Sequence, residues 1–154
     1  RFAIANLRLA SGSAAVHSDM LKWTPSTNRF EAARSILPVI FTTVQYSMDL
    51  KAIPAEQKSE IAKWVRFARE HRGALQEGGF SAYSPEASYP LLEGWSDTER
   101  IFAVYDPKTA VPAPVGDTRR LIVVNATPAR RVLVETACGV KSIEVEPYDF
   151  KEVK

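Results

Sequence analysis

The first half of the chain alternates short strand-like runs with stretches of helical periodicity, and this alternation narrows the possible folds more than any other feature. The clearest helix is predicted at about residues 55–76, where four apolar side chains recur on one helix face: Ile61, Trp64, Val65 and Ala68. A second helix is predicted at about residues 28–41, bent or ended by Pro38. Between the two helices, the β-branched and aromatic run 42–48 predicts a short buried strand, and residues 14–16 are expected to end an earlier strand.

These elements follow the order strand, helix, strand, helix, which is typical of two β/α units of an α/β fold. Parallel strands occur almost only in sheets that are covered on both faces and continued by further strands. Two units cannot close such a sheet. We therefore expect the parallel strands to need neighbours that this chain does not contain.

The second half of the chain predicts a small antiparallel, sandwich-like β-domain. It holds seven of the ten prolines, short β-branched runs and no long helical period. The boundary is expected at Gly78-Gly79, since helix interiors disfavour glycine, and it divides the chain into domains 1–79 and 80–154. The runs that predict strands are Arg100–Tyr105, Arg119–Ala126, Arg131–Thr136 and Ser142–Glu146.

Two connecting segments carry expectations of their own. Residues 106–117 contain three prolines and are expected to form an extended, exposed loop. Residues 151–154 are expected to trail off without a closing strand, and the first residue, Arg1, suggests a chain that was processed or cut from something larger.

Composition excludes several classes of function. The chain has 154 residues, of which 45% are hydrophobic and 25% charged, as in ordinary globular domains. A formal net charge of +2 is too small for a nucleic-acid-binding surface, and no apolar run approaches the ~18–20 residues that span a bilayer. The single cysteine, Cys138, excludes an intrachain disulfide and a multi-cysteine metal site, and it is expected to be buried. We expect no cofactor, no metal, no nucleic acid and no membrane partner.

One polar cluster follows the first candidate strand. It contains His17 and Asp19, which could orient each other or bind a polyhydroxylated ligand, and Trp23, which could stack on a sugar ring. Catalytic groups of parallel α/β folds lie at the carboxyl ends of strands, so this location is suggestive. The competing interpretation is structural: Asp19 caps a turn and Trp23 packs. The other histidine, His71, falls in the last turn of the long helix, where a cation complements the helix dipole.

The stretch from Leu9 to Trp23, Leu-Ala-Ser-Gly-Ser-Ala-Ala-Val-His-Ser-Asp-Met-Leu-Lys-Trp, resembles a late barrel segment of family 36-type α-galactosidases (melibiases). Three later segments fall in the same order as in that family, so the resemblance covers nearly the whole chain: Glu31–Phe41, Trp64–Leu75 and Val124–Thr127.

The resemblance implies the last two β/α units of a (β/α)8 barrel followed by a C-terminal β-domain. The family consists of retaining glycosidases, whose two catalytic aspartates lie on earlier barrel strands, about 5–5.5 Å apart across the scissile bond. It therefore implies that this chain is inactive alone and holds no catalytic residue. His17, Asp19 and Trp23 would belong to the rim of the cleft for the α-galactoside substrate, with Gln45 as a weaker candidate. The exposed barrel strands would favour self-association.

Two other hypotheses stay open. The chain could be a non-catalytic β-domain protein that binds carbohydrate or a protein partner, with Tyr89 and Trp95 as platforms, although aromatic residues near a domain boundary more often pack between domains. It could also be an independent α/β enzyme that uses His17 and Asp19. The sequence leaves the cellular compartment, the sugar and the linkage open.

Overall fold

The computed structural model describes residues 1–12, 14–113 and 119–153. Three helices occur in them, α1 (Phe2–Ser11), α2 (Arg29–Ile36) and α3 (Ala55–Glu70), and single helical turns follow α2 at Leu37–Val39 and α3 at Gly73–Glu77. The strands are β1 (His17–Leu21), β2 (Thr43–Tyr46), β3 (Gly79–Tyr83), β4 (Leu91–Trp95), β5 (Glu99–Val104), β6 (Ala110–Val111), β7 (Arg120–Asn125), β8 (Arg131–Thr136), β9 (Gly139–Glu144) and β10 (Asp149–Val153).

These strands form three separate sheets. β1 and β2 make a parallel pair joined by α2, as a βαβ unit requires. Five strands form the largest sheet in the order β10-β7-β5-β4-β3, and three form the smallest in the order β6-β8-β9. The fold is therefore mixed α/β with several small sheets.

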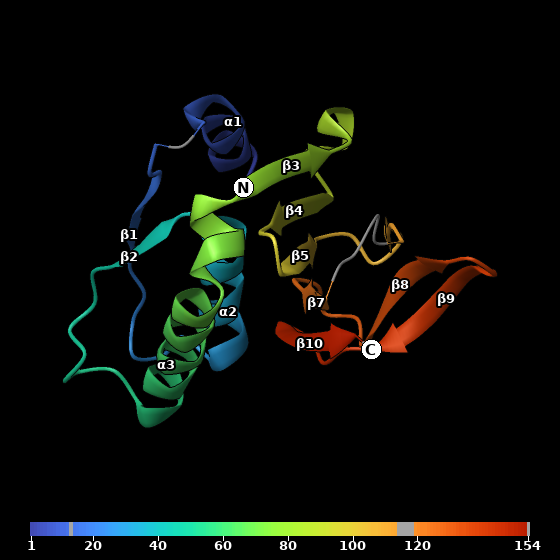
Figure 1. The fold of residues 1–154 in the computed structure, drawn as a ribbon. Coiled ribbons are helices and arrows are strands. Elements are labelled where there is room, and N and C mark those ends of the chain that lie inside the picture. The colour runs from blue at the N-terminus through green and yellow to red at the C-terminus, as the bar shows by residue number, and fades with distance from the viewer. Residues whose placement is uncertain (13, 114–118, 154) are drawn as a thin grey trace.

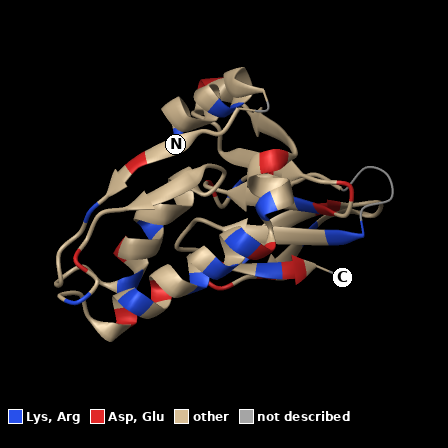
Figure 2. Cartoon of the chain, turned by 60° about the vertical axis from the view of Figure 1, so that its left-hand side comes forward, with Lys and Arg blue, Asp and Glu red and all other residues tan. Residues whose placement is uncertain are grey.

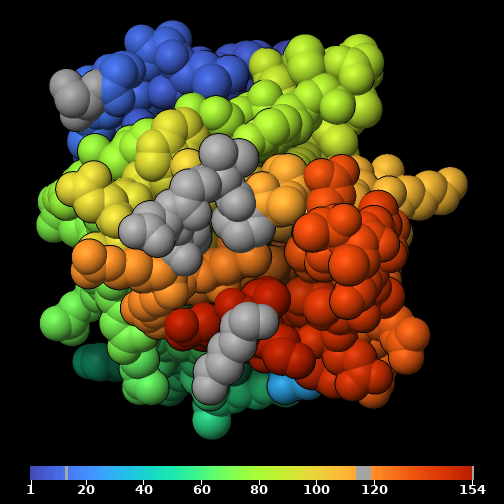
Figure 3. Space-filling model, turned by 45° about the vertical axis from the view of Figure 1, so that its right-hand side comes forward, coloured from blue at the N-terminus to red at the C-terminus, as the bar shows by residue number. Residues whose placement is uncertain are grey.

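The layers are stacked so that the helices lie between the parallel pair and the five-stranded sheet (Figure 1). Alternate residues of β5 and β7 face opposite sides of that sheet. One set joins the core beneath the helices, and the other joins a second core under the three-stranded sheet. In the space-filling view, the orange-red residues of β8 and β9 gather beside the larger sheet (Figure 3). The central strands β5 and β7 are thus buried on both faces, whereas the edge strands β3 and β10 are half-buried or exposed.

The two long helices form for local reasons that also orient them. Asn28 caps α2: its side chain accepts hydrogen bonds from the backbone N–H groups of Phe30 and Glu31, both at 3.0 Å, and the Glu31 carboxylate accepts from the N–H of Asn28. The apolar stripe of α3 brings Trp64 and Phe67 into the core at 1% exposure. Figure 2 shows Lys and Arg interspersed with Asp and Glu along the outer sides of the helices.

In the first half the two predicted helices are confirmed, and both end earlier than expected. A tighter turn that contains Pro38 follows α2 directly, and α3 stops at Glu70, before Gly73. The strand predicted to end at residues 14–16 was wrong, because β1 begins only at His17. The helix α1 was not predicted at all.

The strand predicted at 42–48 is found as β2 but is not buried. Three of its four residues, Thr43, Val44 and Tyr46, are half-buried, and the fourth, Gln45, is exposed. Among the described residues β2 pairs only with β1, so its other edge carries no strand, and Gln45 on one of its faces is exposed to solvent. A strand in a sheet of two has too few neighbours to be buried.

In the second half the four predicted strands are found as β5, β7, β8 and β9, but the pairing is not purely antiparallel. β5 with β7 and β6 with β8 run parallel. Within the predicted exposed loop, Val111 is buried in β6, whereas residues 114–117 lie outside the described part of the chain.

The predicted burial of Cys138 and the predicted lack of a closing strand at the end of the chain were both wrong. Cys138 is exposed, because it lies in the turn between β8 and β9. Lys151, Glu152 and Val153 do not trail off but belong to β10, which pairs with β7 along the edge of the five-stranded sheet.

A buried polar contact joins the helical layer to the sheet. His71 ends α3, and its Nδ1 lies 2.9 Å from Oε2 of Glu99 on β5, with both side chains less than 10% exposed. The Arg120 guanidinium on β7 lies 3.6 Å from the same carboxylate. His71 thus holds the helix end to the sheet, in addition to its predicted place at the helix terminus.

Candidate functional site

The parallel pair β1–β2 has one covered face and one open face. Leu21 and Tyr46 are neighbours in register and pack against the core beneath the helices. Met20 and Gln45, the preceding pair, point the other way and are exposed, Met20 at 60%. Burial raises the pKa of the Tyr46 phenol to about 12. The open face is therefore a strand surface of the kind that parallel sheets normally cover.

Two of the predicted site residues meet on this open face. Nδ1 of His17 lies 3.4 Å from Nε2 of Gln45, a long contact between the first residue of β1 and the middle of β2. Asp19 is exposed, two residues further along β1, where the register shifts by a bulge. The hydroxyl of Ser18 accepts a hydrogen bond from the backbone N–H of Gln45 at 3.0 Å, which fixes that bulge against β2.

The predicted position of His17 relative to its strand was wrong. His17 pairs with Thr43, the first residue of β2, so it lies at the amino end of the parallel pair. The polar run His-Ser-Asp has a weak strand propensity, and only its pairing with β2 makes it a strand. Of the four predicted site residues, only Trp23 follows the carboxyl end of a strand.

Trp23 is held by a buried glutamine on α3. Its indole N–H donates to Oε1 of Gln57 at 2.9 Å, and its ring meets Tyr46 edge-on at 6.5 Å between centroids. The Gln57 amide nitrogen lies 2.6–3.2 Å from three backbone carbonyls of the loop between β1 and α2, those of Thr24, Pro25 and Thr27. Sequence reasoning missed Gln57. The signal was a polar residue on the apolar stripe of a helix, four residues before Ile61.

Replacing Gln57 by leucine is expected to lower the free energy of unfolding by about 2 kcal/mol, because the Trp23 indole and the loop carbonyls lose a partner in a buried place. Urea unfolding followed by tryptophan fluorescence measures this. The control is Gln45→Leu, an exposed glutamine, expected to change stability by less than about 0.5 kcal/mol. Equal losses in the two variants would refute the anchoring role of Gln57.

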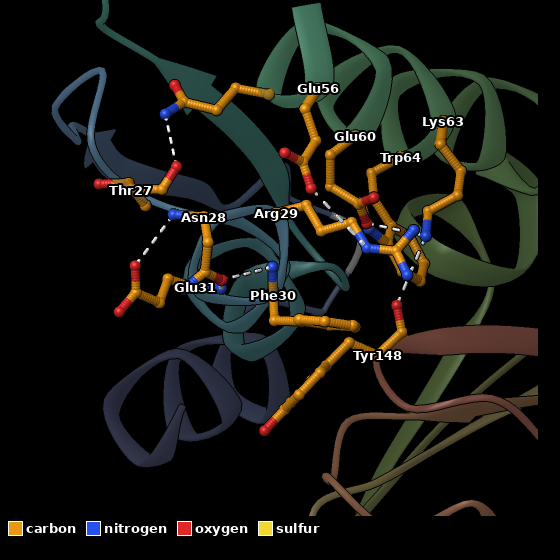
Figure 4. Close-up of polar contacts among 11 residues, drawn as sticks. Thr27, Asn28, Arg29, Phe30, Glu31, Glu56, Glu60, Lys63, Trp64 and Tyr148 are labelled. Carbon is orange, nitrogen blue, oxygen red and sulfur yellow. Dashed lines mark hydrogen bonds and ion pairs between the residues drawn. The ribbon is translucent and has the colours of Figure 1, made fainter. Parts of the chain in front are cut away.

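A charged groove of about 310 Å³ lies where α2 and α3 meet the segment before β10 (Figure 4). Lys63 is its central cation, and its Nζ lies 2.8 Å from Glu60 and 3.5 Å from Asp149. Glu60 also accepts from the Trp64 indole at 2.7 Å. The central charges of this groove are thus already paired with one another. These polar contacts join α3 to the segment before β10.

The two aromatic residues considered as a sugar platform both pack within the protein. Tyr89 is 6% exposed, stacks on Phe2 at 5.2 Å, and donates its hydroxyl to Asn6 at 2.8 Å. Trp95 is half-buried against the backbone of Gly79 and beneath the Arg100 guanidinium. Tyr89 therefore presents no open ring face for a sugar.

Among the described residues, no group of three or more His, Cys, Asp or Glu side chains could hold a metal ion. No helix in the described ranges is long and apolar enough to cross a membrane. Comparisons with known protein families, with curated proteins and with solved structures found no match for this chain.

Proposed function

We propose that this chain is the C-terminal part of a retaining glycosidase similar to α-galactosidases of family 36, and that it is inactive alone. The observation that carries the proposal is the β1–α2–β2 unit. Its strands are parallel, the helical layer covers one of its faces, and in the described part of the chain each strand has a partner on one edge only. A strand of a (β/α)8 barrel has parallel neighbours on both edges and helices on its outer face only.

The order of the layers supports the same proposal. In a barrel, the face of each strand opposite the helices points to the barrel interior. Met20 and Gln45 lie on that face of β1–β2 and are exposed here, as interior residues would be without the other six strands. Behind the helices, the second half of the chain forms a five-stranded sheet, which agrees with the β-domain that the resemblance implies.

The acidic residues of β1 and β2 are too few for catalysis, so these strands are proposed to bind substrate only. A retaining mechanism needs two carboxyl groups about 5–5.5 Å apart. Asp19 is the single acidic residue of β1 and β2, so these strands cannot supply the pair. In this proposal both catalytic aspartates lie on earlier strands. Trp23 borders the α-galactoside cleft at the carboxyl ends of the strands, and His17, Asp19 and Gln45 line the interior below it.

Hydrolysis of a chromogenic α-galactoside by the purified chain tests the absence of catalytic groups. We expect no turnover above background for the chain or for its His17→Ala and Asp19→Ala variants. Turnover that Asp19→Ala abolishes would overturn the proposal, because the polar cluster would then be an active site of its own.

The open strands also predict self-association. Unpaired strand edges with an apolar residue on the open face attract further strands, and a charge placed there opposes this. We expect sedimentation velocity to show dimers or larger species that grow with concentration and that Met20→Lys reduces. The matched control is Val140→Lys on β9, since Val140 is exposed to nearly the same degree, 58% against 60%. A monomer at all concentrations, or equal effects of both variants, would contradict the prediction.

A further inference from the structure

Two aromatic side chains from opposite halves of the chain form a wedge at the surface. Phe30 on α2 is 42% exposed, and Tyr148, which directly precedes β10, is half-buried. Their ring centroids lie 6.0 Å apart and the ring planes are tilted by 53°, so the two rings do not stack face to face. Figure 4 shows the rings converging at one end and spreading apart on the side where Glu31 lies.

The wedge borders a pocket of about 380 Å³ between α2 and two turns of the second half of the chain. Its lining residues include, on the two walls, Phe30, Glu31 and Arg34, and Pro128, Pro147 and Tyr148. The volume falls within the range of small-molecule sites, which lie preferentially between structural units.

Hydrogen bonds fix both walls of this pocket. Asn125 is fully buried, and its amide nitrogen donates to the carbonyl oxygens of Ala129 at 2.6 Å and Val145 at 3.0 Å. Asn125 thereby ties the turn that holds Pro128 to the segment that holds Pro147. On the other wall, the side-chain cap at the start of α2 fixes the helix. Because both walls are ordered in the free protein, less conformational entropy is lost when a ligand binds.

Tyr148 has a backbone conformation that bulky residues rarely adopt. Its φ is +55°, in the left-handed region. Such a conformation is destabilising and persists only where the surroundings hold it. Here the Tyr148 carbonyl oxygen accepts from Nζ of Lys63 at 3.5 Å, and the side chain packs against the core beneath the helices. Strained residues cluster at ligand sites, so the strain points to a role for the Tyr148 ring.

The pocket combines apolar ring surface with an acceptor and a donor of opposite charge. The Glu31 carboxylate uses Oε2 in the helix cap, which leaves Oε1 as an acceptor. The Arg34 guanidinium supplies N–H donors, and it makes no ion pair within the described ranges. Because the charges of Glu31 and Arg34 cancel, the pocket favours an uncharged ligand over an ion.

We propose that this pocket binds a neutral pyranose unit of a carbohydrate. One face of a pyranose ring consists of C–H groups, which suit the Phe30 and Tyr148 rings, and its hydroxyls donate to Glu31 and accept from Arg34. A polyproline helix also binds aromatic grooves, but it has no N–H group to offer the Glu31 carboxylate. The pocket lies on the sheet side of α2, so the inference does not depend on the glycosidase cleft proposed on β1 and β2.

Binding is tested by titrating the chain with the methyl α-glycosides of galactose, glucose, mannose and N-acetylglucosamine. NMR follows saturation transfer from the protein to the sugar C–H protons and the shifts of the Phe30 and Tyr148 ring resonances. We expect at least one glycoside to receive saturation and to shift both rings, equally at low and high sodium chloride because the ligand is uncharged. An oligoproline peptide is titrated in parallel. No response to any of the four glycosides would overturn the proposal, and a response to the peptide alone would assign the pocket to a peptide instead.

Variants of the aromatic wedge place the binding. Phe30→Ala is expected to weaken binding by at least about tenfold, because half of the ring surface is lost, and Phe30→Tyr is expected to retain it. The matched control is Phe2→Ala, since Phe2 on α1 is exposed to nearly the same degree, 48%. Equal binding by the unmodified chain and by Phe30→Ala would overturn the proposal.

Tyr148→Gly covers the case in which Phe30→Ala does not fold. Glycine adopts a φ of +55° without strain, so this variant keeps the backbone of the wall and loses only the ring. It is expected to weaken binding to the same extent as Phe30→Ala. Glu31→Gln keeps an oxygen for the helix cap and loses the charged acceptor, so weaker binding is expected there as well. Unchanged binding in the folded Tyr148→Gly variant would contradict the proposed site.

Discussion

Replacing Glu99 by alanine is expected to lower the free energy of unfolding by about 3 kcal/mol or more, because it removes the centre of a buried polar contact between two layers. The Glu99 carboxylate lies 2.9 Å from Nδ1 of His71 and 3.6 Å from the Arg120 guanidinium. Its removal leaves the buried His71 ring nitrogen without this partner at the end of α3. Urea unfolding followed by circular dichroism measures the loss.

The matched control is Glu135→Ala, which removes an acidic residue from an exposed position on β8 and should change stability by less than about 0.5 kcal/mol. His71→Ala and the double variant complete a cycle. We expect the sum of the two single losses in stability to be larger than the loss in the double variant, because both single substitutions break the same contact. Losses that add within error would mean that His71 and Glu99 do not act as a pair.

Replacing Gly94 by alanine is expected to cost about 3 kcal/mol, at the upper end for overpacking, because the added methyl group has no room. A Cβ at Gly94 would lie 2.3 Å from the carbonyl oxygen of Ala74 and 2.9 Å from the Phe41 ring. The carbonyl belongs to the backbone turn that follows α3, so it cannot rotate away. The helical layer and β4 would have to move apart.

Gly73→Ala is the control for this variant. Its Cβ would meet only the Ser96 side chain, at an ordinary 3.8 Å. Alanine there is expected to leave stability unchanged or to raise it by about 0.4–1 kcal/mol through the unfolded chain. Thermal unfolding of both variants measures the difference in stability. A Gly94→Ala protein as stable as the Gly73→Ala protein would show that the helical layer and β4 do not pack as closely as described.

Periodicity predicted the elements that bury an apolar stripe and missed those that depend on distant contacts. The α3 helix could be predicted because Ile61, Trp64 and their neighbours repeat along one face. The strand β1 could not, because its residues His17 to Asp19 are polar and become a strand only beside β2. The strand β10 depends in the same way on pairing with β7.

The candidate sites divide along the same line. Sequence reasoning selected His17 and Gln45, and the structure brings these two side chains within 3.4 Å. It did not select Gln57, which looks ordinary in a helix and matters because a loop folds over it.

The central claim is that β1 and β2 are the last strands of a glycosidase barrel whose catalytic aspartates precede this chain. The most direct test is to express the complete reading frame that contains this segment and to assay α-galactoside hydrolysis, with product stereochemistry followed by NMR. The account predicts that the complete protein hydrolyses the α-galactoside with retention of configuration, and that this chain alone does not hydrolyse it. Replacing either of two upstream strand-end aspartates by asparagine is expected to abolish the activity of the complete protein. A complete reading frame without a barrel-length upstream segment, or hydrolysis by this chain alone, would contradict it.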